Sequence, residues 1–196
     1  MENGISGSAK CFVISAPSGA GKTTLVNRLI EDKQGVFFDS VSDTTRGRRL
    51  GEIDEIDYNF ISVPEFQSRL ENEEYLEWAR VHENFYGTPR SPLLDAMKDG
   101  LNPLMVLDVQ GYFQVRDNIP YDKLCGIFIL PPNEDELIQR ISGRGGMDAK
   151  ILEIRLENAK KECAFSQEYK YSLTNDNLDM AYAVLRFIVE KEMETI

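Results

Sequence analysis

Cysteine is scarce in this sequence, and its placement argues against two classes of protein. Three cysteines occur in 196 residues, at Cys11, Cys125 and Cys163. They are far apart, odd in number and without a CxxC pair or other metal-ligand spacing, so neither a disulfide scaffold nor a cysteine-ligated metal site is expected. Because Cys11 and Cys125 lie in short apolar runs, we expect buried, reduced thiols and a reducing compartment.

Long apolar runs are also missing. No segment approaches the ~18 apolar residues that a membrane-spanning helix requires. Residues 1–10 are polar and lack the apolar centre of a secretory signal peptide. We therefore expect a flexible tail over residues 1–10, a folded domain over residues 11–196, a cytoplasmic location and no membrane partner.

Basic residues are few. The chain has 22 Lys and Arg and 33 Asp and Glu, which gives a net charge of −11. This balance argues against non-specific binding to nucleic acid. A phosphate-binding protein of this charge must gather its arginines locally. The only histidine, His82, has no Ser, Cys or metal-ligand partner at a useful spacing, so a structural role is expected for it.

The most informative stretch is a glycine-bearing segment that follows the apolar run 11–14 and precedes a helical pattern of apolar residues. Such a loop cradles phosphates, because its backbone N–H groups and the start of the helix converge on an anion. Lys22 would reach the β- and γ-phosphates and the Thr23 hydroxyl would ligate Mg²⁺. Ala16 replaces the first glycine of the strict motif, which is acceptable if its φ stays negative. The candidate ATP-binding residues here are Ala16, Pro17, Ser18, Gly19, Ala20, Gly21, Lys22, Thr23 and Thr24.

An ordinary strand-to-helix turn is the alternative for this segment, but Gly-Lys-Thr at the helix start favours a nucleoside triphosphate site. Elsewhere, short apolar strands alternate with helices, which predicts an α/β fold with a mostly parallel sheet covered on both faces. Strands are predicted at 11–14, 36–41, 58–62, 75–81, 104–108, 124–130 and 171–174. Helices are predicted after residue 21, at 64–72, 92–98, 110–117, 134–142 and 148–165, and from residue 178.

The middle of the chain differs from its flanks. Residues 36–91 are rich in strands with local connections, and residues 84–87 are predicted to form a turn after the strand 75–81. We expect an inserted antiparallel subdomain there, between core segments 11–35 and 92–196. Gly143, Gly145 and Gly146 break the chain between two helices, as either a plain loop or the hinge of a lid.

Three arginines within four residues form a candidate anion site in this acidic chain: Arg46, Arg48 and Arg49. Guanidinium groups can bind phosphate oxygens bidentately, although a solvated basic turn is the alternative. The same region begins a series of motifs that resembles the guanylate kinase family, in the family's order and spacing from about Cys11 to Glu190. The motifs are Val41–Glu52, Tyr58, Glu77-Trp78, Tyr86-Gly87-Thr88, Asp108–Gly111 and Ile129–Pro132.

The resemblance implies transfer of the γ-phosphoryl group of ATP to GMP, with Mg²⁺. It implies a P-loop NTPase-type parallel sheet core flanked by helices, a small mixed α/β GMP-binding insertion at about 36–91 and a short helical lid at about 140–160. The residues that it assigns to the GMP phosphate are Arg46, Arg49, Tyr58 and Tyr86. Those that it assigns to guanine are Ser42, Glu77, Thr88 and Asp108.

Glu77 is the expected specificity element, because a carboxylate can accept from guanine N1–H and N2–H₂ together and adenine offers no such pair. The alternative is a charge on a strand surface, just as Tyr58 and Tyr86 could be half-buried strand aromatics. Asn175 matches a family contact near the adenine of ATP, or is a turn residue before the last helix.

Arginines near the glycine-bearing break are the expected lid residues. Phosphoryl transfer needs positive charge on the migrating group and exclusion of water, which a closing lid supplies. Arg140 and Arg144 could share one helix face if the helix continues, although exposed charges paired with glutamates are the alternative. The expected catalytic set is Lys22, Arg46, Arg140, Arg144 and Arg155.

Three positions depart from the family pattern. Val106 stands where the family usually has an aspartate, and valine offers no oxygen to a Mg²⁺-bound water, so weaker turnover or metal binding is expected. Alternatively, Val106 extends the apolar run of a buried strand. Arg48 stands where proline is common, and Gly47 loosens the same turn further.

Two other functions stay open. A guanylate-kinase-like interaction module without catalysis is disfavoured by the retained Gly21-Lys22-Thr23. A kinase of the same fold with another phosphorylated acceptor is disfavoured by Glu77 with Asp108. The sequence leaves the oligomeric state open.

Overall fold

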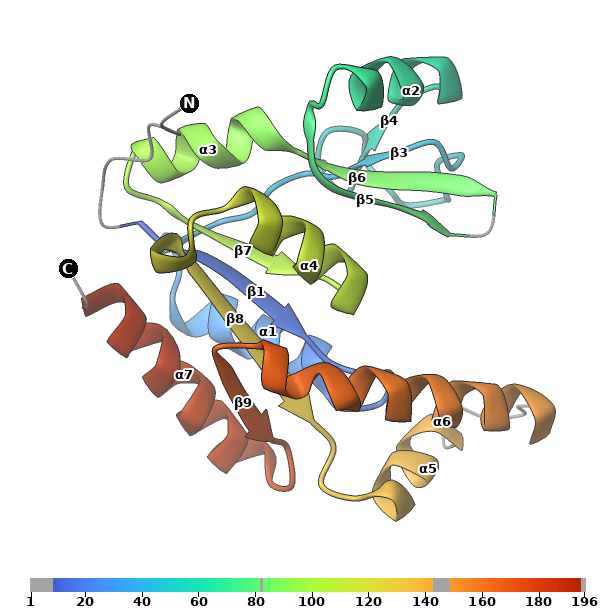
Figure 1. Cartoon of the computed structure of the whole chain (residues 1–196), viewed down its shortest axis with the longest axis vertical. Coiled ribbons are helices and arrows are strands. Elements are labelled where there is room, and N and C mark those ends of the chain that lie inside the picture. The colour runs from blue at the N-terminus through green and yellow to red at the C-terminus, as the bar shows by residue number, and fades with distance from the viewer. Residues whose placement is uncertain (1–8, 82, 143–148, 195–196) are drawn as a thin grey trace.

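The computed structural model describes residues 9–81, 83–142 and 149–194 (Figure 1). His82, Arg144 and the glycines at 143, 145 and 146 lie outside the described residues. Within the described parts, no helix is long and apolar enough to cross a bilayer.

A five-stranded parallel sheet forms the centre, in the order β2-β7-β1-β8-β9. Its strands are β1 (Cys11–Ser15), β2 (Phe37–Phe38), β7 (Asn102–Val106), β8 (Leu124–Leu130) and β9 (Tyr171–Thr174). Because successive side chains of a strand point to opposite faces, β1 directs Phe12 and Ile14 to one face and Cys11 and Val13 to the other. The predicted α/β fold with a parallel sheet core is confirmed.

Helices cover both faces of this sheet (Figure 1). On the Phe12 face, α1 (Lys22–Asp32) and α7 (Leu178–Glu194) contribute buried Leu25, Leu29 and Leu185. On the Cys11 face, α3 (Arg90–Lys98) and α4 (Val109–Asn118) contribute buried side chains that include Leu93. Two short 3-10 helices, η1 (Tyr121–Lys123) and η2 (Phe165–Glu168), flank β8 and β9. Helices therefore cover both faces of the sheet, and the functional site lies at the ends of its strands.

Two further helices, α5 (Glu134–Ser142) and α6 (Ala149–Ala164), pack on each other through a small cluster of Leu137, Ile141 and Ala159. The α5 helix also packs against the loop after β1. A Cβ atom placed on Gly19 would lie 3.0 Å from Ile141 and 3.4 Å from Leu137. The glycine thus permits close contact between this loop and α5.

A second, four-stranded sheet has the order β4-β3-β6-β5 and lies beside α2 (Val63–Glu71) (Figure 1). Its strands are β3 (Asp43–Thr44), β4 (Asn59–Phe60), β5 (Tyr75–Val81) and β6 (Asn84–Pro89). Phe66 of α2 stacks on Tyr75 and Phe85 with centroid distances of 4.5 and 5.2 Å, and so fastens the helix to the sheet.

The structure corrects several predictions for this block. The turn expected at 84–87 was wrong, because β6 runs through it and pairs with β5 as a hairpin. The sheet is mixed rather than antiparallel, since β3 and β4 are parallel. The strands expected at 36–41 and 58–62 shrink to two residues each, and β3 was not predicted, because polar residues surround these short pairings.

Candidate active site

The loop between β1 and α1 adopts a conformation that only glycine takes easily at two positions. Gly19 and Gly21 have φ angles of 87° and 86°, while Ala16 is buried and keeps its φ out of the positive range. A Cβ atom on Gly21 would lie 2.3 Å from Asn175 Nδ2. The loop therefore tolerates Ala16 but requires glycine where it turns into α1.

Asn175 supports this loop directly. Its buried side-chain amide donates to the carbonyl of Ala20 (2.8 Å), and its backbone N–H donates to Leu130 (2.9 Å). Arg140 in turn donates from Nη1 to the Asn175 carbonyl (3.2 Å). Residues after β8 and β9 thus support the loop after β1, a role for Asn175 that the sequence did not indicate.

Lys22 is the first residue of α1 and is half-buried beside two acidic groups. Burial lowers the pKa of its ammonium group, while the charges of Glu162 on α6 and of Asp108 oppose that shift. Glu162 was not predicted, because it belongs to a helix distant in sequence. Burial raises the pKa of Glu162, and Asp108 raises it further, while Lys22 lowers it.

Thr23 and Thr24 follow in the first turn of α1 and are exposed. In the part of the chain that the structure describes, no three His, Cys, Asp or Glu side chains gather as metal ligands. A magnesium ion here would therefore depend on the Thr23 hydroxyl, water and the phosphates of a nucleotide. That set fits Mg²⁺, which keeps several waters and binds with phosphate oxygens.

Three residues expected to read guanine lie in one hydrogen-bonded row. Glu77 and Thr88 are register partners across β5 and β6, and the Thr88 hydroxyl donates to Glu77 Oε1 (2.6 Å). The Ser42 hydroxyl lies 3.4 Å from that of Thr88. Burial raises the pKa of Glu77; the hydrogen bond from Thr88 opposes this rise, and the charge of Asp108 adds to it.

Asp108 caps the N-terminus of α4, where its Oδ1 accepts the N–H of Gly111 (2.8 Å). A Cβ atom on Gly111 would lie 3.3 Å from Glu77 Oε2 and 3.5 Å from Asp108 Oδ1. Gly111 therefore leaves room for the carboxylates of Glu77, on β5, and Asp108, at the start of α4, to approach each other. The first turn of α4 thus joins Asp108 to the row of Ser42, Thr88 and Glu77.

The residues expected to hold the acceptor phosphate surround Arg46. Its guanidinium carbon lies 5.5 Å from the centre of the Tyr58 ring, and the Tyr58 and Tyr86 rings are 6.0 Å apart. Arg49 is exposed nearby in sequence. An unpredicted residue, Glu52, pairs with Arg46 through two hydrogen bonds of 3.0 and 2.8 Å.

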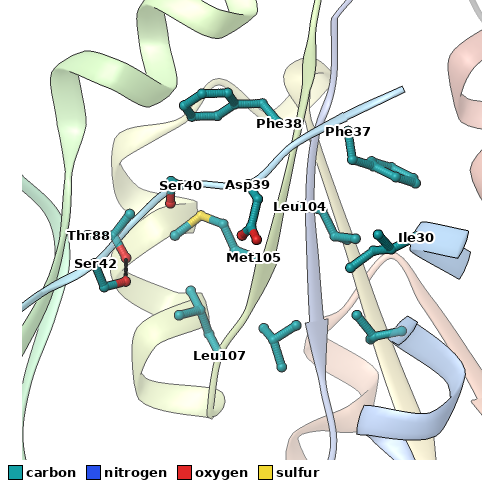
Figure 2. A pocket seen from close by; sticks show the side chains of 12 residues that line it. Ile30, Phe37, Phe38, Asp39, Ser40, Ser42, Thr88, Leu104, Met105 and Leu107 are labelled. Atoms are coloured by element: carbon teal, nitrogen blue, oxygen red, sulfur yellow. Dashed lines mark hydrogen bonds between the residues drawn. The ribbon is translucent and has the colours of Figure 1, made fainter. Parts of the chain in front are cut away.

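A cavity of about 230 Å³ lies between the row of Ser42 and Thr88 and the parallel sheet (Figure 2). Ser42 and Thr88 line one part of it, and Figure 2 shows the carboxylate of Asp39 pointing into it. Val106 also lines this cavity and is 46% exposed at the end of β7. Val106 is the last residue of β7, so it does extend the apolar run of that strand, but its side chain is exposed because the strand ends there.

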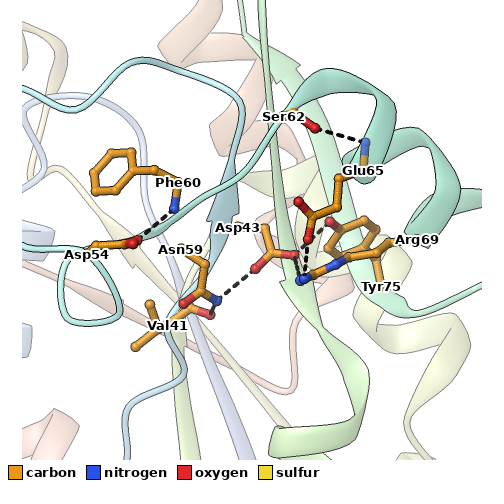
Figure 3. A network of polar contacts seen from close by, with 9 residues as sticks. All are labelled: Val41, Asp43, Asp54, Asn59, Phe60, Ser62, Glu65, Arg69 and Tyr75. Carbon is orange, nitrogen blue, oxygen red and sulfur yellow. Dashed lines mark hydrogen bonds and ion pairs between the residues drawn. The ribbon is translucent and has the colours of Figure 1, made fainter.

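Asp43 anchors β3, the strand that precedes Arg46 and Arg49 (Figure 3). Its carboxylate is fully buried and accepts hydrogen bonds from Arg69 (2.6 Å), the Tyr75 hydroxyl (2.7 Å) and the Asn59 amide (2.8 Å). A buried carboxylate is tolerated when it is paired and hydrogen-bonded in this way. Asp43 thus links β3 to β4, β5 and α2 directly beside Ser42.

The remaining predicted arginines are not gathered at one point. Arg140 on α5 pairs with Glu136 (2.7 Å) and lies next to the phosphate loop, since a Cβ atom on Gly19 would be 3.7 Å from its Cβ. Arg155 is exposed on α6, and Arg144 lies outside the described residues.

A strand, a loop with two left-handed glycines and a helix that begins with Lys-Thr define a P-loop nucleotide-binding protein. The family model for guanylate kinase matches residues 8–192. The chain belongs to the guanylate kinase family.

Relatives of known function agree with this assignment. The chain is 42% identical over 192 residues to guanylate kinase of Brucella melitensis biotype 1, covering 98% of this chain and 87% of that protein. It is 43% identical over 178 residues to guanylate kinase of Dechloromonas aromatica, covering 91% and 87%. The crystal structure of guanylate kinase from Anaplasma phagocytophilum superposes with a TM-score of 0.73 at 31% identity, covering 95% and 87% of the two chains. The chain is accordingly a nucleoside monophosphate kinase that phosphorylates GMP with ATP.

Proposed function

We propose that this chain transfers the γ-phosphoryl group from ATP at the phosphate loop to GMP held by Glu77 and Thr88. The observation that supports this most is the position of Asp108, whose charge acts on both the Lys22 ammonium and the Glu77 carboxyl. Two sites that share one carboxylate are close neighbours, as in-line transfer between two bound nucleotides requires.

In this proposal, the residues of the phosphate loop bind the ATP phosphates through backbone N–H groups. Lys22 adds charge at the β- and γ-phosphates, and Asn175 holds the loop in shape through Ala20. Thr23 would hold Mg²⁺, which when bound neutralises phosphate charge. Val106 supplies no oxygen for a water molecule of that ion, so we expect metal binding to be weaker than with an acid there.

The acceptor is held at both ends. Arg46, Arg49, Tyr58 and Tyr86 bind the GMP phosphate as two cations and two hydroxyls around one dianion. Glu77 accepts from guanine N1–H and N2–H₂, and Ser42, Thr88 and Asp108 complete the base site. We propose that residues 36–91 form the GMP-binding insertion and that the core is built from 11–35 and 92–196.

The transfer step needs positive charge and a dry site rather than a general base. We propose that segment 140–160 closes as a lid, so that Arg140, Arg144 and Arg155 join Lys22 and Arg46 around the migrating group. A cytoplasmic location, with no nucleic-acid or membrane partner, is proposed from the net charge of −11 and the free thiols Cys11, Cys125 and Cys163.

The test is ADP release from ATP and Mg²⁺ with GMP, dGMP, AMP, UMP and CMP offered in parallel. We expect release to depend on GMP and to fall by about 10²–10³-fold in Lys22→Ala, as when a group that stabilises transition-state charge is removed. Lys33→Ala is the matched control, because this lysine of the same region only pairs with Glu190. GMP binding without ADP release would instead indicate a binding module.

A further inference from the structure

Glu52 lies at the centre of the proposed acceptor-phosphate site. Its Oε1 and Oε2 accept from Nη2 and Nη1 of Arg46 at 2.8 and 3.0 Å. Its Oε2 also accepts the backbone N–H of Arg49 at 2.7 Å. One carboxylate thus contacts both arginines that are proposed to bind the phosphate.

The pair is sheltered rather than freely solvated. The side chains of Arg46 and Glu52 are only 13% and 19% exposed. The Arg46 guanidinium lies near the rings of Tyr58 and Phe60, at 5.5 and 5.8 Å from their centres. The hydrogen bonds from Arg46, and then that from the Arg49 N–H, lower the pKa of Glu52 to about 2, so its carboxylate is ionised at neutral pH.

The pairing with Glu52 determines which N–H groups of Arg46 are left to bind a phosphate. A guanidinium has five N–H donors. Both N–H groups of Nη1 are used, one by Glu52 and one by the carbonyl of Gly47 (2.9 Å), and Glu52 uses one of Nη2. The N–H of Nε and the second N–H of Nη2 lie on the same edge of the guanidinium. They form a fork that can bind a phosphate bidentately, beside Tyr86, whose side chain also hydrogen-bonds to Arg46.

We propose that Glu52 is a positioning residue for the acceptor phosphate, rather than a carboxylate that the phosphate displaces. It holds the guanidinium plane of Arg46 by one edge and presents the other edge to the phosphate. Through the N–H of Arg49 it also holds the turn that carries the second arginine. This turn contains Gly47 and Arg48, which do not restrain the backbone as proline would.

The inference rests on the proposed function, and Glu52→Gln tests it. Glutamine keeps the size of the side chain but loses the charge and offers one acceptor oxygen instead of two. We expect the KM for GMP to rise about tenfold, because a charge-assisted bidentate pair is lost, and kcat to fall as well, because Arg46 is also proposed to lie beside the migrating group. The KM for ATP and the inhibition constant of guanosine, which has no phosphate, should not change.

Two further variants complete the test. Glu83→Gln removes a carboxylate of the same insertion whose partner is the exposed Arg80, and we expect it to leave every constant unchanged. Glu52→Asp keeps the charge one methylene further away, and we expect an intermediate KM for GMP. This second variant also preserves the test if Glu52→Gln does not fold.

Three results would overturn the inference. A lower KM for GMP in Glu52→Gln would mean that the carboxylate competes with the phosphate for Arg46. An equal weakening of guanosine and GMP would mean that Glu52 only maintains the fold, and unchanged constants would mean that it does neither. The wild-type assay separates failure of this inference from failure of the proposed function. If the wild-type protein shows no GMP-dependent ADP release, the proposed function is overturned as well.

Discussion

Two opposing effects act on the carboxyl group of Glu77: burial disfavours its charge, and a hydrogen bond from Thr88 favours it. It is 8% exposed, and burial raises the pKa of its carboxyl, with Asp108 adding to that rise. The Thr88 hydroxyl, which donates at 2.6 Å, holds one oxygen in place and partly offsets the cost of burial. A buried acceptor of this kind suits guanine, whose N1–H and N2–H₂ satisfy a carboxylate that is otherwise costly to bury.

Glu77→Gln should abolish the preference for GMP over AMP. We expect kcat/KM for GMP to fall about 100-fold, because the amide N–H₂ of Gln opposes a guanine donor. Parallel ADP-release assays with GMP and AMP measure the ratio, with Glu83→Gln as control. An unchanged ratio in Glu77→Gln would show that the guanine assignment is wrong.

The same variant has a pH-dependent effect on stability. A carboxyl whose pKa is raised on folding binds protons more tightly in the folded state, so the wild type loses stability as pH rises from the ordinary carboxyl pKa to the raised value. Glutamine does not titrate. Thermal unfolding from pH 4 to 8 should therefore show Glu77→Gln gaining stability relative to the wild type as pH rises. A difference that stays constant would contradict the raised pKa.

At the scale of elements, the phosphate loop is held from behind by the chain that follows β9. Asn175 donates to the carbonyl of Ala20 and is packed so closely that Gly21 has no room for a Cβ atom. This contact restrains the loop itself. A loop restrained in this way keeps its N–H groups directed at phosphates before any nucleotide arrives.

Asn175→Ala should raise the KM for ATP and for GTP by the same factor, about tenfold, and should destabilise the fold by about 1–3 kcal/mol, because the Ala20 carbonyl loses its partner. Steady-state kinetics with both donors and thermal unfolding measure these effects. Asn177→Ala is the matched control. Asn177 accepts from the N–H groups of Asp179 and Met180 at the start of α7, so its loss costs only about 1 kcal/mol of stability. A selective loss of ATP would indicate an adenine contact at Asn175 instead.

The sequence predicted the long elements well and the short ones poorly. The strands at 75–81, 124–130 and 171–174 and the helix at 134–142 match the structure, because apolar periodicity over several residues reports burial directly. The two-residue strand β3 buries too little apolar surface to leave such a pattern, and β4 is only a short part of the strand predicted at 58–62. They depend on pairing partners distant in sequence.

The same limit applies to the site. Lys22, Ser42, Glu77 and Thr88 could be named because the motifs contain them. The resemblance also points to Asn175, but its support of the loop, like the effect of Glu162 on Lys22, comes from an element more than 100 residues away, which spacing does not reveal. Glu52 had one signal that could have found it, a single acid closing a run of three arginines.

At the scale of the whole molecule, Val106 lies where the two sheets meet. It ends β7, lines the cavity of about 230 Å³ that Ser42 and Thr88 also line, and is 46% exposed. The apolar side chain thus borders the same cavity as two residues of the proposed guanine site. We expect the valine to weaken Mg²⁺ binding rather than to disturb the packing of the sheet.

Val106→Asp should lower the Mg²⁺ concentration needed for half-maximal activity by about tenfold, because a carboxylate can hold a metal-bound water. A Mg²⁺ titration at saturating ATP and GMP measures this. Val106→Ala is the control, since it shortens the side chain without adding an oxygen. Equal Mg²⁺ dependence in the wild type and Val106→Asp would show that the position does not face the ion.

The Asp43 network has a consequence for how the small sheet aligns itself. Strands of two residues form too few backbone hydrogen bonds to define their own register, and a slip of one residue turns every side chain to the opposite face. Only one alignment places a carboxylate within reach of Arg69, Tyr75 and Asn59 together (Figure 3). Asp43 therefore fixes the register of these short strands, because any other register would leave its carboxylate without these partners. In this way it determines which way Ser42 and the arginines that follow it face.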